Sequence, residues 1–153
     1  MWKVKRYWLS TGAGYNHMND IVVLQTCQGL IRYLDEVLGA SVAREKGIVV
    51  GYDHRMKGSL SSAGFARITA AVFVSQGYKV YFLEDLVATP FVAYGVTFLG
   101  CAAGIMVTAS HNPKLDDGYK VSFIVMCRLT ASRYLPSTDI GLLGQWVTNY
   151  SAS

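Results

Sequence analysis

The stretch that decides the fold is Gly104–Val121, which reads GIMVTASHNPKLDDGYKV. It opens with five apolar or weakly polar residues, Gly104 to Thr108, and then changes to the polar run that starts at Ser110. Gly118 then permits a tight turn back into extended chain. The pattern predicts a buried strand that ends in a polar loop. Ser110 would lie at the carboxyl end of this strand, where open α/β sheets bind their ligands.

Size and composition are typical of one globular domain. A chain of 153 residues can bury a sizeable core, and 52% hydrophobic against 16% charged residues excludes a disordered chain. The formal net charge is +4, and three of the positive residues lie within the first six positions. The rest of the chain has no basic stripe, so we do not expect a nucleic-acid partner.

The three cysteines, Cys27, Cys101 and Cys127, are far apart and include no C-x-x-C pair. Neither a disulfide framework nor a zinc site is indicated. We therefore expect buried free thiols in a reducing compartment, which favours a cytoplasmic location.

No residue from Leu86 to Ser110 is charged, and this run is long enough to span a bilayer. Thr89-Pro90 is typical of a helix start, and Gly95, Gly100 and Gly104 interrupt the run. We interpret it as a buried helix followed by a buried strand, and we do not expect a membrane partner. A small membrane-associated protein is an alternative that rests on this run alone.

Hydrophobic periodicity and end signals predict three helices and four strands. The helices are expected from 19 or 20 to 38, from 61 or 62 to 76 and from 89 to about 100, and the strands at 47–53, 78–83, 102–108 and 119–125. This order predicts an α/β fold, with a mixed, mainly parallel sheet and helices on both faces.

Two short motifs carry a resemblance to a known family. Thr108–Pro113 (TASHNP), followed by Asp117–Lys120 (DGYK), resembles the phosphoserine loop of the α-D-phosphohexomutases. The similarity is greatest to the branch that includes phosphopentomutase-type phosphoglucomutase and glucose-1,6-bisphosphate synthase. It covers about residues 12–121 and implies the fold of the family's domain I. Residues 1–11 and 122–153 diverge, and we expect the second segment to be partly disordered; both ends are typical of a truncated or alternatively spliced product.

The resemblance implies a catalytic site centred on Ser110. In the family this serine carries a phosphoryl group, which passes to a sugar phosphate and is taken back from the bisphosphate. A serine hydroxyl is a poor nucleophile unless a base, metal or charge assists it. Lys120 matches the lysine of the family's Gly-x-Lys, implied to act as general base or to steady the transferring phosphate. Arg55 matches an Asp-x-Arg motif and is implied to contact the phosphoserine, with Asp53 orienting it.

The other loop residues receive weaker assignments. The resemblance implies a hydrogen-bonding or proton-handling role for His111, although adjacency to Ser110 does not by itself make a Ser-His pair. Asn112 and Lys114 are expected to bind phosphate, and each of these residues could instead be an ordinary loop residue. Asp117 stands where relatives usually have Asn, and we expect it to add a negative charge beside the phosphate site.

Family enzymes bind Mg²⁺ through a phosphoserine oxygen and three Asp residues of a later domain. Ser110, as phosphoserine, is the one metal ligand that the resemblance assigns here, so the site is expected to be incomplete. The resemblance implies an intramolecular phosphotransferase domain, like those of phosphoglucomutase or phosphopentomutase, that acts on hexose or pentose phosphates, and we expect the chain by itself to be inactive. The alternative is a non-catalytic fragment with a phosphate-binding or interaction role.

Overall fold

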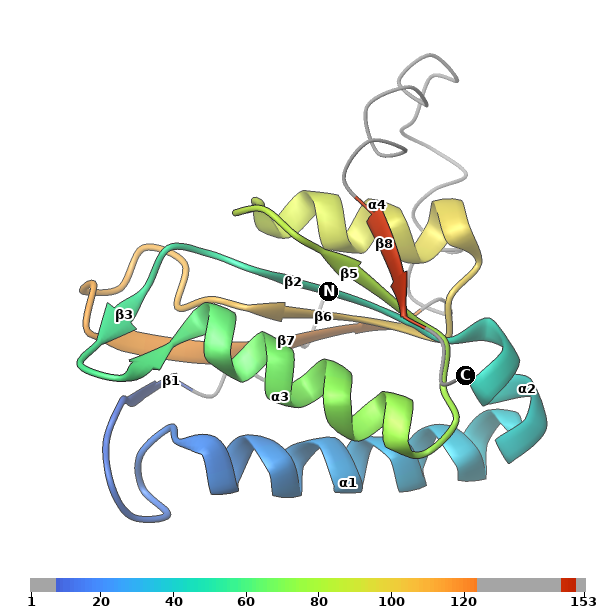
Figure 1. The fold of residues 1–153 in the computed structure, drawn as a ribbon, viewed down its shortest axis with the longest axis horizontal. Coiled ribbons are helices and arrows are strands. Elements are labelled where there is room, and N and C mark those ends of the chain that lie inside the picture. Colours follow the sequence, from blue (N-terminus) through green and yellow to red (C-terminus); the bar gives the residue numbers. More distant parts are fainter. Residues whose placement is uncertain (1–7, 124–146, 151–153) are drawn as a thin grey trace, which may run out of the picture.

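The computed structural model describes residues 8–123 and 147–150. They form a six-stranded sheet in the order β1-β7-β6-β2-β5-β8, with helices on both faces (Figure 1). The strands are β1 (Trp8–Ser10), β2 (Ile48–Tyr52), β5 (Val80–Leu83), β6 (Ala103–Val107), β7 (Asp116–Phe123) and β8 (Val147–Tyr150). The central strands β6, β2 and β5 are parallel, whereas β7, β1 and β8 pair antiparallel with their neighbours. This confirms the mixed, mainly parallel α/β sheet.

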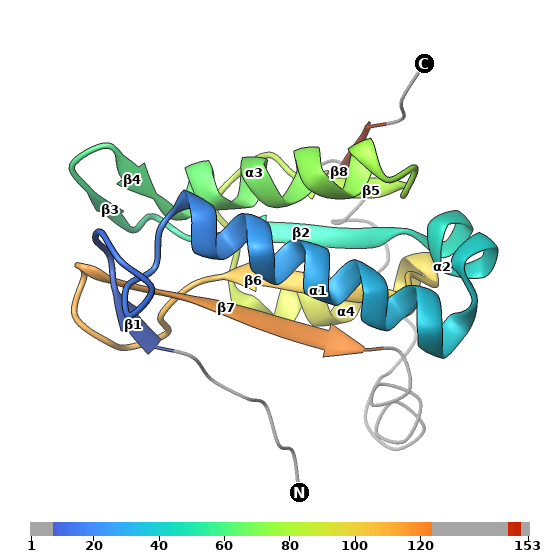
Figure 2. The same cartoon turned by 90° about the horizontal axis from the view of Figure 1, so that it is seen from below.

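Helices form a layer on each side of the sheet. Seen from below, α1 (Asp20–Leu38) and α3 (Ser62–Ser75) cover one face and α4 (Thr89–Leu99) lies beyond the sheet on the other (Figure 2). The short helix α2 (Ala40–Lys46) connects α1 to β2, and a separate hairpin of β3 (Met56–Lys57) and β4 (Leu60–Ser61) connects β2 to α3. Asn19 caps α1, since its side chain accepts a hydrogen bond from the backbone N–H of Val22.

The three expected helices and four expected strands are present, and β1, α2, the β3–β4 hairpin and β8 are additional. The last expected strand begins earlier, at Asp116 instead of 119, and positions 124 and 125 lie outside the described residues. Most of the segment 122–153, which we expected to be partly disordered, also lies outside them. Within that segment, β8 pairs with β5.

The uncharged run 86–110 becomes α4 and β6, packed against each other. A Cβ atom built on Gly104 would lie 2.4 Å from Cγ2 of Val96, so the helix can approach the strand only because this side chain is missing. In the described ranges 8–123 and 147–150, no helix is long and apolar enough to cross a membrane. Cys27 and Cys101 are buried and free, and Cys127 lies outside these ranges.

Candidate active site at the carboxyl ends of the parallel strands

Two chain segments far apart in sequence meet where β2 and β6 end, at the left of Figure 1. The strands are parallel neighbours, and Tyr52 pairs with Val107 in their register. The next residues are therefore adjacent: the backbone N–H of Asp53 donates to the carbonyl of Val107 at 3.2 Å, and Thr108 Oγ1 donates to Asp53 Oδ2 at 2.6 Å. Sheet topology thus brings the Asp53–Arg55 segment beside the serine loop, Thr108–Leu115.

Ser110 is exposed and has an unusual backbone. Its φ is 58°, and no other non-glycine residue in the described part of the chain has a positive φ. Such a conformation costs an L-residue free energy, so neighbouring contacts must hold it. The N–H of Ser110 donates to Thr108 Oγ1 at 2.9 Å, and its carbonyl accepts from Arg55 Nη2 at 2.7 Å. The loop therefore displays the Ser110 hydroxyl on a fixed backbone.

Lys120 reaches this hydroxyl from β7. It pairs with Met106 of β6, and its Nζ donates to Ser110 Oγ. Side chains alternate along a strand. The preceding residue, Tyr119, faces the opposite side, where its hydroxyl lies 3.0 Å from Thr69 Oγ1 of α3. The alternation thus directs the lysine to the serine side of the sheet.

Arg55 is buried, with 6% of its surface exposed, and its guanidinium lies beneath the serine loop. Nε donates to Asp53 Oδ2 at 2.9 Å, while Nη1 and Nη2 donate to the carbonyls of Ser110, Asn112, Pro113 and Asp116 at 2.7 to 3.1 Å. A guanidinium has five N–H donors, so these acceptors match its full capacity. The direct contact with phosphoserine expected from the sequence would require some of these hydrogen bonds to be exchanged.

A second polar layer lies below Arg55. Ser62 Oγ is 2.8 Å from Asp53 Oδ1 and 2.8 Å from Asp117 Oδ2, and the N–H of Gly118 donates to Asp117 Oδ1 at 2.8 Å. Asp117 is only 2% exposed. Burial raises the pKa of its carboxyl to about 6; the nearby Asp53 charge adds to this, and the hydrogen bonds from Gly118 and Ser62 and the Arg55 charge oppose it. The Asp117 side chain thus binds Ser62 of α3, instead of lying beside a phosphate.

The remaining expected site residues lie on the rim of the loop. His111 and Lys114 are exposed and Asn112 is half-buried, with its N–H donating to the carbonyl of Ala109 at 3.1 Å. All three come together with Ser110, on the exposed side of the loop.

Sequence reasoning missed the supports of this loop. Thr11 Oγ1 donates to the carbonyl of Leu115 at 3.0 Å, and Lys57 Nζ donates to the carbonyl of Thr11 at 2.6 Å. The sequence marks Ser62 only as a possible start of a helix, and the N-cap of that helix is its neighbour Ser61, which accepts a hydrogen bond from the backbone N–H of Gly64. The one signal in the sequence for the role of Ser62 is the presence of two adjacent serines, Ser61 and Ser62, at a helix start, where one cap is enough. Nothing in the sequence points to Thr11.

The described residues do not form a magnesium site by themselves. Within them, no group of three His, Cys, Asp or Glu side chains could hold a metal ion. Both oxygens of Asp53 already accept hydrogen bonds, from Arg55, Ser62 and Thr108. A phosphorylated Ser110 would supply one oxygen, whereas Mg²⁺ takes six ligands in near-octahedral geometry.

Residues 9–123 match the family described as phosphoglucomutase/phosphomannomutase, alpha/beta/alpha domain I. The chain belongs to the phosphoglucomutase/phosphomannomutase family. The crystal structure of a phosphomannomutase from Thermus thermophilus superposes with a TM-score of 0.63 at 26% identity, and the match covers 80% of this chain and 25% of that one. The likeness to domain I of this family is therefore present in both sequence and fold.

Curated members of the phosphoglucomutase/phosphomannomutase family are more similar in sequence. Human phosphopentomutase is 49% identical over 112 residues, which are 72% of this chain and 18% of the relative. Mouse glucose 1,6-bisphosphate synthase is 43% identical over 122 residues, which are 78% of this chain and 19% of that relative. Saccharomyces cerevisiae phosphoribomutase is 42% identical over 120 residues, which are 76% of this chain and 18% of that relative. The chain thus matches about a fifth of the length of these relatives.

Proposed function

We propose that this domain carries a phosphoryl group on Ser110 and exchanges it with a sugar phosphate. The observation that supports this most directly is the contact of Lys120 Nζ with Ser110 Oγ, in a loop whose backbone is bound by the buried Arg55. The relatives are named for a pentose phosphate and a glucose bisphosphate, so we propose hexose or pentose phosphates as substrates. The free, buried Cys27 and Cys101 support a cytoplasmic location.

The proposed step uses charge and position. A sugar hydroxyl attacks the phosphorus of phospho-Ser110, the bond from phosphorus to Oγ breaks, and Oγ takes a proton from the Lys120 ammonium. The proton released by the sugar hydroxyl returns to the lysine amine, so protons balance over the step. Phosphoryl transfer depends mainly on positioning and on stabilising the charge of the transferring group. The fixed backbone of Ser110 supports the first requirement and the lysine supports the second.

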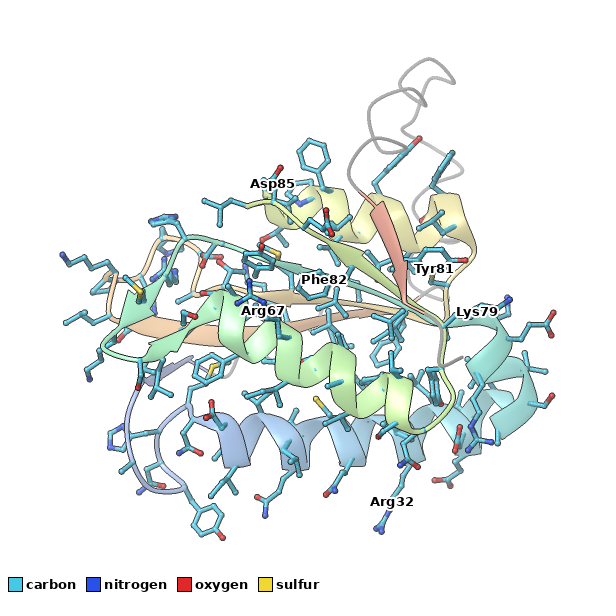
Figure 3. The ribbon with its side chains drawn as sticks, in the orientation of Figure 1. Arg32, Arg67, Lys79, Tyr81, Phe82 and Asp85 are labelled. Carbon is cyan, nitrogen blue, oxygen red and sulfur yellow. The ribbon has the colours of Figure 1, made fainter. Side chains whose placement is uncertain are left out.

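The test is the intact mass of the chain after incubation with glucose 1,6-bisphosphate. We expect a gain of one phosphoryl group, mapped to Ser110 by fragmentation, and no gain in Ser110→Ala. Lys120→Ala should slow the gain by at least about tenfold, because it loses the charge beside Oγ. Lys79→Ala is the matched control, since this exposed lysine lies at the opposite end of the sheet (Figure 3). An unmodified Ser110, or equal labelling of Ser110→Ala, would contradict the proposal.

A second candidate is a phosphate-binding domain without turnover. It is favoured by the described residues, which supply one prospective magnesium ligand. Under this alternative, the chain binds phosphate but Ser110 gains no phosphoryl group, and glucose 1-phosphate with Mg²⁺ gives no glucose 6-phosphate. Turnover that disappears in Ser110→Ala would exclude this second candidate.

A further inference from the structure

Beneath the serine loop, one hydroxyl group lies between two carboxyl groups. Ser62 Oγ is 2.8 Å from an oxygen of Asp53 and 2.8 Å from an oxygen of Asp117. A hydroxyl has a single proton to donate, so Ser62 can donate to only one of these oxygens at a time. The other contact would then join two acceptors, unless one carboxyl group carries a proton of its own.

Asp53 is the less suitable carrier of this proton. Arg55 Nε donates to its Oδ2 at 2.9 Å, and Thr108 Oγ1 donates to the same oxygen at 2.6 Å. A guanidinium in contact stabilises the ionised form of a carboxyl group. Asp117 forms no salt bridge with any residue of the described part of the chain, and its Oδ2 contacts Ser62. The extra proton therefore belongs on Asp117.

We propose that Asp117, in its protonated form, positions the serine loop through Ser62, Asp53 and Arg55. Asp117 donates to Ser62, Ser62 donates to Asp53, and the ionised Asp53 fixes the guanidinium that binds the loop carbonyls. Asp117 is thus a positioning residue and not a catalytic one. The inference rests on the proposed function, because the loop that it controls is the proposed phosphoryl carrier.

Burial and the charged groups near Asp117 together determine the pH at which this proton is lost. Asp53 and Arg55 face it from the loop after β2, while β1 contributes Leu9 as its register partner and α3 contributes the neutral Ser62. Burial above all, and then the Asp53 charge, raises the pKa of Asp117 to about 6. Above that pH, two carboxylates compete for the single proton of Ser62, and Asp53 loses the hydrogen bond that orients it whenever Ser62 donates to Asp117.

The proton can be observed directly by carbon-13 NMR titration of the aspartate carboxyls in the unphosphorylated full chain. We expect Asp117 to titrate near pH 6. Asp85→Asn, a matched change at an exposed residue near the start of α4 (Figure 3), should leave the titration unchanged. The proposal is overturned if Asp117 titrates at the ordinary aspartate pKa of about 3.9, or if Asp53 carries the proton instead.

Positioning is tested by amide hydrogen exchange at Asn112 and Asp116, the loop N–H groups bonded to Ala109 and Pro113. After correction for intrinsic exchange, we expect protection in the wild type to fall by about tenfold as pH rises through 6, because the loop opens more often. Asp117→Asn should keep protection constant, since an amide donates to Ser62 at every pH. The proposal is overturned if amide protection in Asp117→Asn depends on pH as it does in the wild type, or if protection in the wild type does not change with pH.

The two proposals fail separately. Both measurements use the unphosphorylated chain, so the absence of phosphoryl transfer to Ser110 would defeat the proposed function without changing either result. If Asp117→Asn does not fold, the wild-type titration alone decides whether the proton is present.

Discussion

Arg55 supports the serine loop by its shape as well as by its charge. Its buried guanidinium donates to Asp53, to three backbone carbonyls of the serine loop and to the carbonyl of Asp116 at the start of β7. Arg55→Ala leaves the Asp53 carboxylate without its cation and the carbonyls without donors, so we expect a loss of about 3 to 5 kcal/mol in the free energy of unfolding. Urea denaturation measures this loss.

Arg55→Lys separates the two contributions, because it keeps the charge but lacks the planar five-donor geometry. We expect a loss intermediate between those of wild type and Arg55→Ala, together with fast amide exchange in the loop. The control is Arg32→Ala, at an exposed arginine that points away from the sheet on α1 (Figure 3), with an expected change within about 0.5 kcal/mol. A lysine variant as stable as wild type would show that charge alone is sufficient.

Asp117 also makes the stability of the folded chain depend on pH. Its pKa is about 6 in the folded state and 3.8 in the reference state, so the folded state binds the proton more tightly. The stabilisation from this group is complete below pH 3.8. It is lost progressively as pH rises from 3.8 through 6, and the free energy of unfolding falls by roughly 3 kcal/mol in all. Asp117→Asn should remove this loss, so its gain in stability relative to wild type should grow as pH rises from about 4 to 6.5. Parallel urea midpoints across that range would contradict the assignment.

Part of this site could be predicted from sequence and part could not. Ser110 and Arg55 each follow an apolar strand, and adjacent parallel strands bring such residues together. The acceptors of Arg55, however, are mainly backbone carbonyls, which every residue type has, so no sequence pattern identifies them. The Asp117 contact with Ser62 joins residues 55 positions apart, and only the folded chain reveals it.

At the scale of elements, the predictable parts are those with a long pattern. The 19 residues of α1 carry buried positions at helical spacing between an Asn cap and a Gly stop, and the periodicity identifies them. The seven-residue α2 has Gly39 as its N-cap, which offers no side-chain cap, and β3 and β4 have two residues each. Seven residues make fewer than two helical turns and two residues make a single period of strand alternation, so these elements could not be recognised from sequence.

The contact of α4 with the sheet gives a prediction at the same scale. Gly104→Ala would place a Cβ 2.4 Å from Val96 and 2.9 Å from a Val92 methyl group. The helix must then shift away from β6, and we expect a loss of about 1 to 3 kcal/mol in the free energy of unfolding. Gly29→Ala is the matched control: it is exposed on α1 with nothing within 4 Å of the new Cβ, and should stabilise by up to about 1 kcal/mol. Equal effects of the two substitutions would show that α4 is not tightly packed.

At the scale of the whole molecule, two cores share one sheet. The larger core lies between the sheet and helices α1 and α3 and includes Leu34, and the smaller lies beneath α4 and includes Val96. The strands β2, β5 and β6 contribute residues to both: Ile48 and Val50 face the larger core, and Val49 faces the smaller. Because alternate residues of one strand fill the two cores, loss of either core exposes the same strands.

This shared sheet predicts one cooperative unfolding transition for both cores. Leu34→Ala should cost about 2 to 5 kcal/mol and Val96→Ala about 1 to 3 kcal/mol, because each leaves a cavity. Each should move circular dichroism and intrinsic fluorescence midpoints together. Val37→Ala, at a residue 55% exposed on α1, is the control and should change stability by less than about 0.5 kcal/mol. If Val96→Ala instead produced a separate early transition while Leu34→Ala shifted only the later one, α4 and its core would unfold as an independent unit.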